Sequence, residues 1–336
     1  MNFLIFFFFS FFFFFFFFFF YIGDPHVSSV RPGRRKDDYL ASVIGKLMKA
    51  SEICWERALQ PLILGDLFHR AKENHLPTLA QLFEVLGNFP VQPLVLGGNH
   101  DKNDTLLQDA DALSLFAQTG VIEVLDGPCR AWRTIETDEG PVQLWGAPYG
   151  AEIPDVIEAE GEGPVVLVTH HDLAFHGAYP GAQLLKEIRG CDMVVNGHMH
   201  FTTPSVQKGR TWWHNPGNIE PISIDCREHK PAVWAWARGT SCKALERIDL
   251  PHNSDCFDLT GLAVEASDAA SAAAALPESQ FAELLSQDEW LGAKAVENDG
   301  EAFLEDLSAG LEEIEAPAPV KSLLTALAQG AGPEAG

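Results

Sequence analysis

Five apolar stretches of this chain each end in a short polar turn, and this pattern restricts the possible folds more than any other feature. The turns read GDPH at 23–26, GDLFH at 65–69, GGNHD at 97–101, VTHH at 168–171 and NGHMH at 196–200. Ligand sites in open α/β sheets lie just beyond the C-terminal ends of strands. The pattern therefore predicts a sheet whose strand ends bring these turns together in one site.

Strands alternate with helical stretches between the turns. Apolar residues recur at helical spacing over 75–89, where Leu79, Leu82, Phe83 and Leu86 share one face, and a second helix over 109–120 is closed by Gly120. The strand segments are continuous apolar runs, which are typical of sheets buried on both faces. The chain is therefore predicted to be an α/β protein built in layers.

The possible metal ligands of the five turns are nitrogen and oxygen donors, with no thiolate among them. Such donors suit manganese, iron or zinc and differ from a structural cysteine zinc site. Seven ligands are too many for one ion but suit two ions that share a carboxylate, an arrangement that clamps phosphoryl groups and activates water. The seven are Asp24, His26, Asp66, Asn99, His170, His198 and His200.

In this order and context the five turns resemble the motifs of the calcineurin-like metallophosphoesterases, over about residues 21–220. The resemblance implies a four-layer sandwich of two packed mixed β-sheets flanked by helices. It also implies which residues hold each ion, with Asp66 bridging both. One ion would be held by Asp24, His26 and His200, and the other by Asn99, His170 and His198.

The same resemblance assigns roles to residues beside the ions. His100 would lie next to the scissile phosphate, where it stabilises charge or protonates the leaving oxygen. Asp101 would orient the ring of His100. His170, which directly follows its strand, is expected to be the ligand, and His171 to be its neighbour.

The GDLFH turn is similar to that of the SbcD-like DNA-repair exonucleases of phage and bacterial type, which places His69 in the active site. The chain would then be a DNA exonuclease or endonuclease of repair, recombination or phage DNA metabolism. Its partners would be DNA, an SbcC-like ATPase subunit docked on the acidic C-terminal helices, and a second copy in a homodimer. The loop RPGRRKDD would supply positive charge near the site through Arg31, Arg34, Arg35 and Lys36.

Two other functions fit the same motifs. One is a small-molecule or cyclic-nucleotide phosphodiesterase or phosphatase. The other is a non-catalytic scaffold, which is disfavoured because no ligand is missing. The net charge of −24 argues against unassisted binding to nucleic acid. It does not argue against a phosphate substrate, because bound metal ions invert the local field.

The chain begins with a run of phenylalanine that ends in YIGDPH. A membrane helix over 3–22 is long enough, but it would consume the strand that carries Asp24 in the family. A signal peptide needs a basic region and a small-residue cleavage site, and neither is present. We therefore expect FFFFYI to be the central buried strand of the sheet, preceded by a low-complexity extension over 1–16.

The expected domain organisation follows from these assignments. The catalytic domain is expected over 17–240, an accessory helical region over 241–314 and a tail over 315–336. This acidic C-terminal appendage holds 4 basic and 19 acidic residues from 241 onward. The six cysteines are scattered singly, which indicates a reducing compartment and a cytoplasmic location, in the host if the protein is encoded by a phage.

Overall fold

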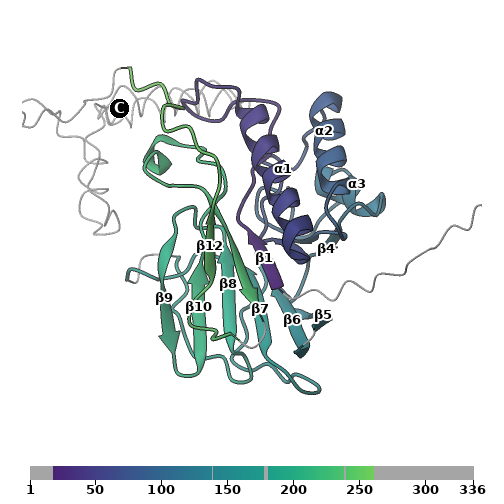
Figure 1. The fold of residues 1–336 in the computed structure, drawn as a ribbon, viewed down its shortest axis with the longest axis vertical. Coiled ribbons are helices and arrows are strands. Elements are labelled where there is room, and N and C mark those ends of the chain that lie inside the picture. Colours follow the sequence, from purple (N-terminus) through teal and green to yellow (C-terminus); the bar gives the residue numbers. More distant parts are fainter. Residues whose placement is uncertain (1–17, 138, 178–180, 238–239, 261–336) are drawn as a thin grey trace, which may run out of the picture.

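A computed structural model describes residues 18–137, 139–177, 181–237 and 240–260. Two six-stranded sheets, each with parallel and antiparallel pairs, pack against each other. Three α-helices gather on one side of the first sheet (Figure 1). The predicted α/β class with two packed mixed sheets is confirmed.

The first sheet has the strand order β12-β11-β1-β2-β3-β4. Its inner strand β1 runs parallel to β2 and antiparallel to β11, and it leads directly into the GDPH turn. The expectation for the last residues of the phenylalanine run is thus confirmed, while residues 1–17 lie outside the described part of the chain. The bounds are β1 Phe18–Ile22, β2 Leu59–Ile63, β3 Leu94–Leu96, β4 Glu123–Leu125, β11 Ala232–Ala237 and β12 Glu246–Asp249.

Both faces of β1 are buried, which explains why an unbroken apolar run suits it. Successive strand residues point to opposite faces. Phe19 and Tyr21 pack toward the second sheet, whereas Phe20 and Ile22 pack toward the helices. A strand covered on both sides has no polar face, so its sequence does not alternate.

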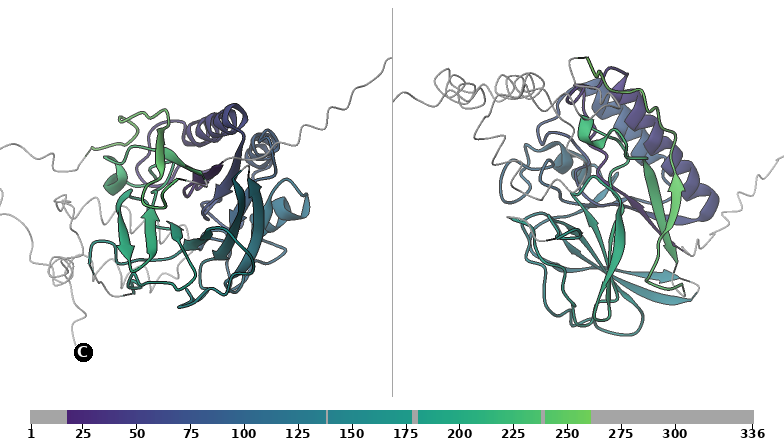
Figure 2. Two further views of the ribbon diagram at one scale, coloured as in Figure 1. Left: turned by 60° about the horizontal axis from the view of Figure 1, so that its bottom comes forward. Right: turned by 90° about the vertical axis from the view of Figure 1, so that its left-hand side faces the viewer.

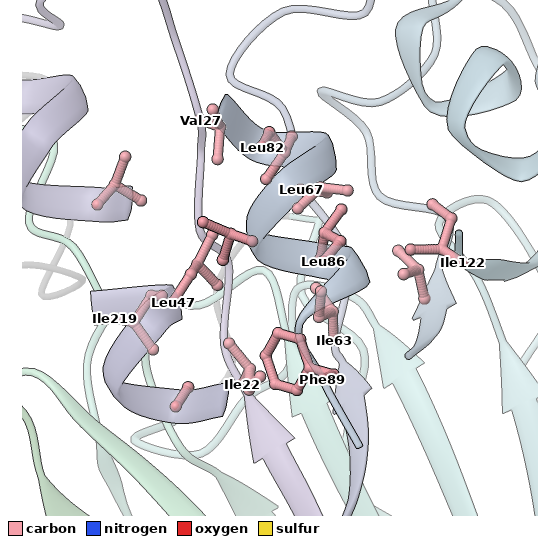
Figure 3. Close-up of a cluster of buried hydrophobic side chains, with 14 of the residues drawn as sticks. Ile22, Val27, Leu47, Ile63, Leu67, Leu82, Leu86, Phe89, Ile122 and Ile219 are labelled. Atoms are coloured by element: carbon pink, nitrogen blue, oxygen red, sulfur yellow. The ribbon is translucent and has the colours of Figure 1, made fainter. Parts of the chain in front are cut away.

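The helical layer consists of α1 (Tyr39–Arg57), α2 (Leu76–Gly87) and α3 (Ala112–Gln118). Figure 3 shows Leu47 of α1 and Leu82 and Leu86 of α2 in the buried cluster with Ile22 of β1. The sequence predicted α2 and α3, but α1 was not among the predicted helices. Phe83, expected on the buried face of α2, is instead 45% exposed.

The second sheet has the order β5-β6-β7-β8-β10-β9. Its inner face supplies part of the core between the sheets, and the two sheets and the helical layer can be followed in Figure 2. The described residues of 148–164 and 171–191 form no helix, and irregular segments cover its outer face there. The bounds are β5 Arg130–Thr137, β6 Gly140–Ala147, β7 Val165–His170, β8 Met193–Gly197, β9 Thr203–Lys208 and β10 Thr211–Asn215.

The first sheet continues beyond residue 240, the expected end of the catalytic domain. Strand β12 pairs with β11, and Phe257 forms a β-bridge with Arg35. The remainder of the accessory region, from 261, and the expected tail lie outside the described residues. Within the described ranges, no helix is long and apolar enough to cross a membrane.

Candidate metal centre

The backbone is strained at the turns that were predicted to bind metal. Among the described residues, only five other than glycine have positive φ. One of them, Ala58, is the C-terminal cap of α1 and lies outside the predicted turns. Such residues cost on the order of 1–3 kcal/mol each and cluster at functional sites. The other four are Asp24 at 32°, His26 at 47°, Asp66 at 48° and His198 at 69°.

The first half of the site is formed by turns that follow β1 and β8. The Nε2 atoms of His26 and His200 lie 3.0 Å apart, and His26 Nε2 lies 3.7 Å from Asp66 Oδ2. Asp24 is fully buried, and neither of its oxygens accepts a hydrogen bond of good geometry. Burial, with the Asp66 carboxylate nearby, raises the pKa of Asp24 to about 7. An ionised carboxylate buried without such partners is costly unless a cation binds it, so these residues fit a metal ion.

The second half of the site is formed by the last residue of β7, His170, and by the turns that follow β3 and β8. His170 Nδ1 donates to the carbonyl oxygen of Leu64 at 2.8 Å, which leaves Nε2 to face Asn99 Oδ1 at 3.1 Å. The same Asn99 oxygen lies 2.9 Å from His198 Nδ1. Backbone carbonyls orient metal-binding imidazoles in this way, so the second donor set also fits an ion.

Asp66 lies between the two halves. Its Oδ2 faces His26 Nε2 on one side and His170 Nε2 at 3.3 Å on the other. Its Oδ1 accepts the backbone N–H of His100 at 2.8 Å. Burial opposes ionisation of Asp66, but the neighbouring imidazoles outweigh it and hold the pKa of this carboxyl well below its usual range. One ionised carboxylate is therefore placed to serve both donor sets.

Two glycines allow the turns to approach so closely. A Cβ atom on Gly98 would lie 2.1 Å from Asp66 Oδ1. A Cβ atom on Gly65, whose φ is +112°, would lie 2.2 Å from His170 Nδ1. Only glycine fits at these two positions, which explains the glycines in GDLFH and GGNHD.

His100 and His69 adjoin the first half of the site. His100 Nδ1 donates to the backbone carbonyl oxygen of His69 at 2.8 Å, so Nε2 is the ring nitrogen left for a substrate. The His69 ring lies nearly parallel to that of His100, with 5.4 Å between centroids. Its Nδ1 is buried without a hydrogen-bond partner, and burial lowers the pKa of His69 to about 4. One nitrogen each from His26, His69 and His100 lies within 4.8 Å of the others.

The expected role of Asp101 is wrong. Its two oxygens accept the backbone N–H groups of Phe68 and Gly98, each at 3.0 Å. The group that holds the ring of His100 is the His69 carbonyl instead. Asp101 therefore ties the GGNHD turn to the GDLFH turn and does not orient His100.

Tyr149, which the sequence did not single out, also contacts the candidate ligands. Its ring lies 5.7 Å from that of His198 and is 42% exposed. Its N–H donates to Gly97 at 2.9 Å, and its carbonyl accepts the ammonium of buried Lys102 at 3.0 Å. The one available sequence signal was its place two residues after the end of β6, because that strand lies beside β7.

Positive charge near the site is lower than the loop RPGRRKDD suggested. Arg35, expected to supply positive charge near the site, is instead 5% exposed and bound to the carboxylates of Asp37 and Glu220. Lys36 pairs with Asp255 at 2.7 Å.

His171, expected to be a neighbour of the ligands, is buried and donates to the carbonyl of a loop residue at 2.7 Å.

Comparisons with known proteins identify one family. The family of calcineurin-like phosphoesterases matches residues 19–201. A solved structure described as a novel archaeal phosphodiesterase is 15% identical, with 69% of this chain and 99% of that chain covered and a TM-score of 0.37. A second solved structure is 13% identical, with 69% and 98% covered and a TM-score of 0.39. No curated protein matches the chain. The family match spans more than half of the residues and all five polar turns, so the chain belongs to the calcineurin-like phosphoesterase family and is a metal-dependent phosphoesterase.

Proposed function

We propose that this protein hydrolyses phosphodiesters with two divalent metal ions, and that its substrate is DNA. The observation that carries the proposal is the position of Asp66 between two sets of nitrogen and oxygen donors. Manganese is the ion we propose, and iron or zinc would suit the same donors. One ion would bind Asp24, His26 and His200, the other would bind Asn99, His170 and His198, and Asp66 would bind both.

The chemistry divides between the ions and the side chains. Ions bound at this site would neutralise the phosphoryl oxygens and activate water. His100 presents Nε2, because its Nδ1 is held by the His69 carbonyl. That nitrogen can donate a hydrogen bond to a phosphoryl oxygen or a proton to the leaving oxygen. The carboxylate of Asp101 holds the turn that carries His100.

DNA is favoured by the position of His69. Its ring packs against His100 and His26, with centroids 5.4 and 5.5 Å away, as expected for a histidine that lines the active site. Arg35 and Lys36 are paired with carboxylates and so offer less charge to a long phosphate backbone. A partner ATPase subunit that adds basic surface is therefore part of the proposal.

His69→Ala is expected to lower the rate of DNA hydrolysis by about 10²-fold, because the variant removes only the ring beside His100. The His69 carbonyl remains, so the His100 ring keeps its hydrogen bond. Metal content, measured by elemental analysis, should equal that of the wild type. His176→Ala is the matched control, since this histidine is exposed. Loss of metal from His69→Ala would show that His69 is a ligand, and an unchanged rate would remove the argument for DNA.

A small phosphodiester is the second candidate substrate. Arg35 is buried in ion pairs, and the chain carries a net charge of −24. Most affinity for DNA comes from cations that neutralise phosphates. A small substrate needs only the charge of the bound ions, so it requires no basic surface.

Tyr149 is expected to bind the flat ring of a nucleotide or aryl ester. Its ring is exposed, and its backbone is fixed by hydrogen bonds at both the N–H and the carbonyl. Stacking of a base on an aromatic ring is worth about 1–3 kcal/mol. Tyr149→Ala should therefore raise KM about tenfold with little change in kcat, and Tyr149→Phe should behave as wild type. A fall in metal content with KM unchanged would instead mean that the ring only supports His198.

One assay separates the candidate functions. Protein loaded with Mn²⁺ is incubated with linear double-stranded DNA, single-stranded DNA and bis-p-nitrophenyl phosphate. DNA degradation that is lost in Asp66→Ala supports the nuclease. Hydrolysis of the small ester with intact DNA supports the second candidate. Inactivity on every substrate with every divalent metal would contradict both catalytic candidates. The non-catalytic scaffold would then be the remaining function.

A further inference from the structure

A cluster of charged side chains lies buried beside the GDPH turn and has no role in the chemistry above. Glu220, 1% exposed, accepts hydrogen bonds from Arg35 at 2.6 Å, Lys46 at 2.5 Å and Ser42 at 2.8 Å. Arg35 also forms two bonds to Asp37, at 2.8 and 2.7 Å. The two cations and two carboxylates balance in charge, and their hydrogen bonds offset the cost of burying them.

The cluster is connected to both ends of the GDPH turn. Tyr39, whose ring lies 5.1 Å from the Arg35 guanidinium carbon, donates its buried hydroxyl to the carbonyl of His26 at 2.7 Å. At the other end, the N–H of Ile219, next to Glu220, donates to the carbonyl of Gly23 at 2.9 Å.

The same segment also reaches the turn after β8. The N–H of Asn218 donates to the carbonyl of His200 at 3.0 Å. Segment 218–220 therefore contacts the two turns that supply Asp24, His26 and His200, and Glu220 anchors this segment to α1 through Lys46 and Ser42.

Asp24 and His26 need such support because both have positive φ. A strained backbone persists only where the surrounding structure holds it. We infer that Tyr39 and Glu220 position the GDPH turn for metal binding, and that Tyr39 acts through its bond to the His26 carbonyl. The inference rests on the proposed ion at Asp24, His26 and His200. It states that the affinity of the site for this ion depends on the buried cluster.

Calorimetric titration of the metal-free full-length protein with Mn²⁺ tests this role. Tyr39→Phe removes only the hydroxyl. It should lower the affinity for one of the two ions by at least about tenfold and leave the affinity for the other unchanged. Ser51→Ala is the matched control, because Ser51 lies on the same helix and donates a buried hydroxyl to the carbonyl of Asn88 at 2.9 Å. Both variants should lower Tm to a similar extent, but Ser51→Ala should bind both ions as the wild type does.

The outcomes separate this inference from the proposed function. Wild-type affinities in Tyr39→Phe would overturn the positioning role and leave the two-metal site intact. If Ser51→Ala weakens Mn²⁺ binding as much as Tyr39→Phe does, the positioning role is overturned as well. The loss of affinity would then follow from lower stability of the fold and not from the lost bond to the His26 carbonyl. A wild-type protein that binds no Mn²⁺ would overturn both proposals. Glu220→Gln, which should also weaken a single ion, decides by the same criterion if Tyr39→Phe fails to fold.

Discussion

Asp66→Ala is expected to abolish phosphodiester hydrolysis and to remove both metal ions. Asp66 Oδ2 faces an imidazole nitrogen from each donor set, at 3.7 Å for His26 and 3.3 Å for His170. Without this carboxylate each set loses its shared anionic ligand. Asp24 is then the one carboxylate left among neutral imidazole and amide donors, which is too little negative charge for two divalent ions. We expect kcat/KM to fall by at least about 10³-fold.

Steady-state kinetics and elemental analysis after dialysis against Mn²⁺ measure this effect. Asp155→Ala is the control, because that carboxylate is 79% exposed and forms an ion pair with Lys186 on the surface. The control should keep two ions and full activity. If Asp66→Ala loses one ion and keeps the other at wild-type affinity, Asp66 serves a single donor set and the two-metal arrangement is wrong.

His100→Ala is expected to lower kcat by about 10²–10³-fold while both ions stay bound. The backbone N–H of His100, which holds Asp66 Oδ1 at 2.8 Å, remains in the alanine variant. Only the imidazole is lost, so the variant separates the chemistry of the ring from the geometry of the metal site. Metal content, measured in parallel, should therefore match that of the wild type.

The choice of substrate shows which task the His100 ring performs. The sugar alkoxide released from DNA is strongly basic and needs a proton, whereas p-nitrophenolate needs little protonation. A general acid at His100 thus predicts a larger loss on DNA than on bis-p-nitrophenyl phosphate. Equal losses on both would assign the ring to charge stabilisation, and an unchanged kcat on both would contradict any direct role.

The convergence of the five turns could be predicted from the sequence because β1, β2 and β3 are parallel neighbours, as are β7 and β8. Parallel strands place their C-terminal ends at one edge, so residues that follow them meet whatever the connections are. This reasoning located Asp24, Asp66 and Asn99 without knowledge of any side-chain contact. The alternation that normally marks a strand was not needed, since both faces of β1 are buried.

Contacts that depend on distant partners could not be predicted in this way. Arg35 looks like a surface cation in its own loop, but Glu220 lies 185 residues further along the chain and buries it. Asp101 follows His100 directly, yet its oxygens bind the amides of Phe68 and Gly98. Charge type and spacing do not reveal which donors the folded chain brings to a carboxylate.

Anomalous diffraction from crystals grown with Mn²⁺ tests the central claim most directly. Two peaks should lie roughly 3.5–4 Å apart, with the Asp66 carboxylate as a ligand of both. Asp24, His26 and His200 should surround one peak, and Asn99, His170 and His198 the other. A single peak, or two peaks that do not share Asp66, would contradict the two-metal site.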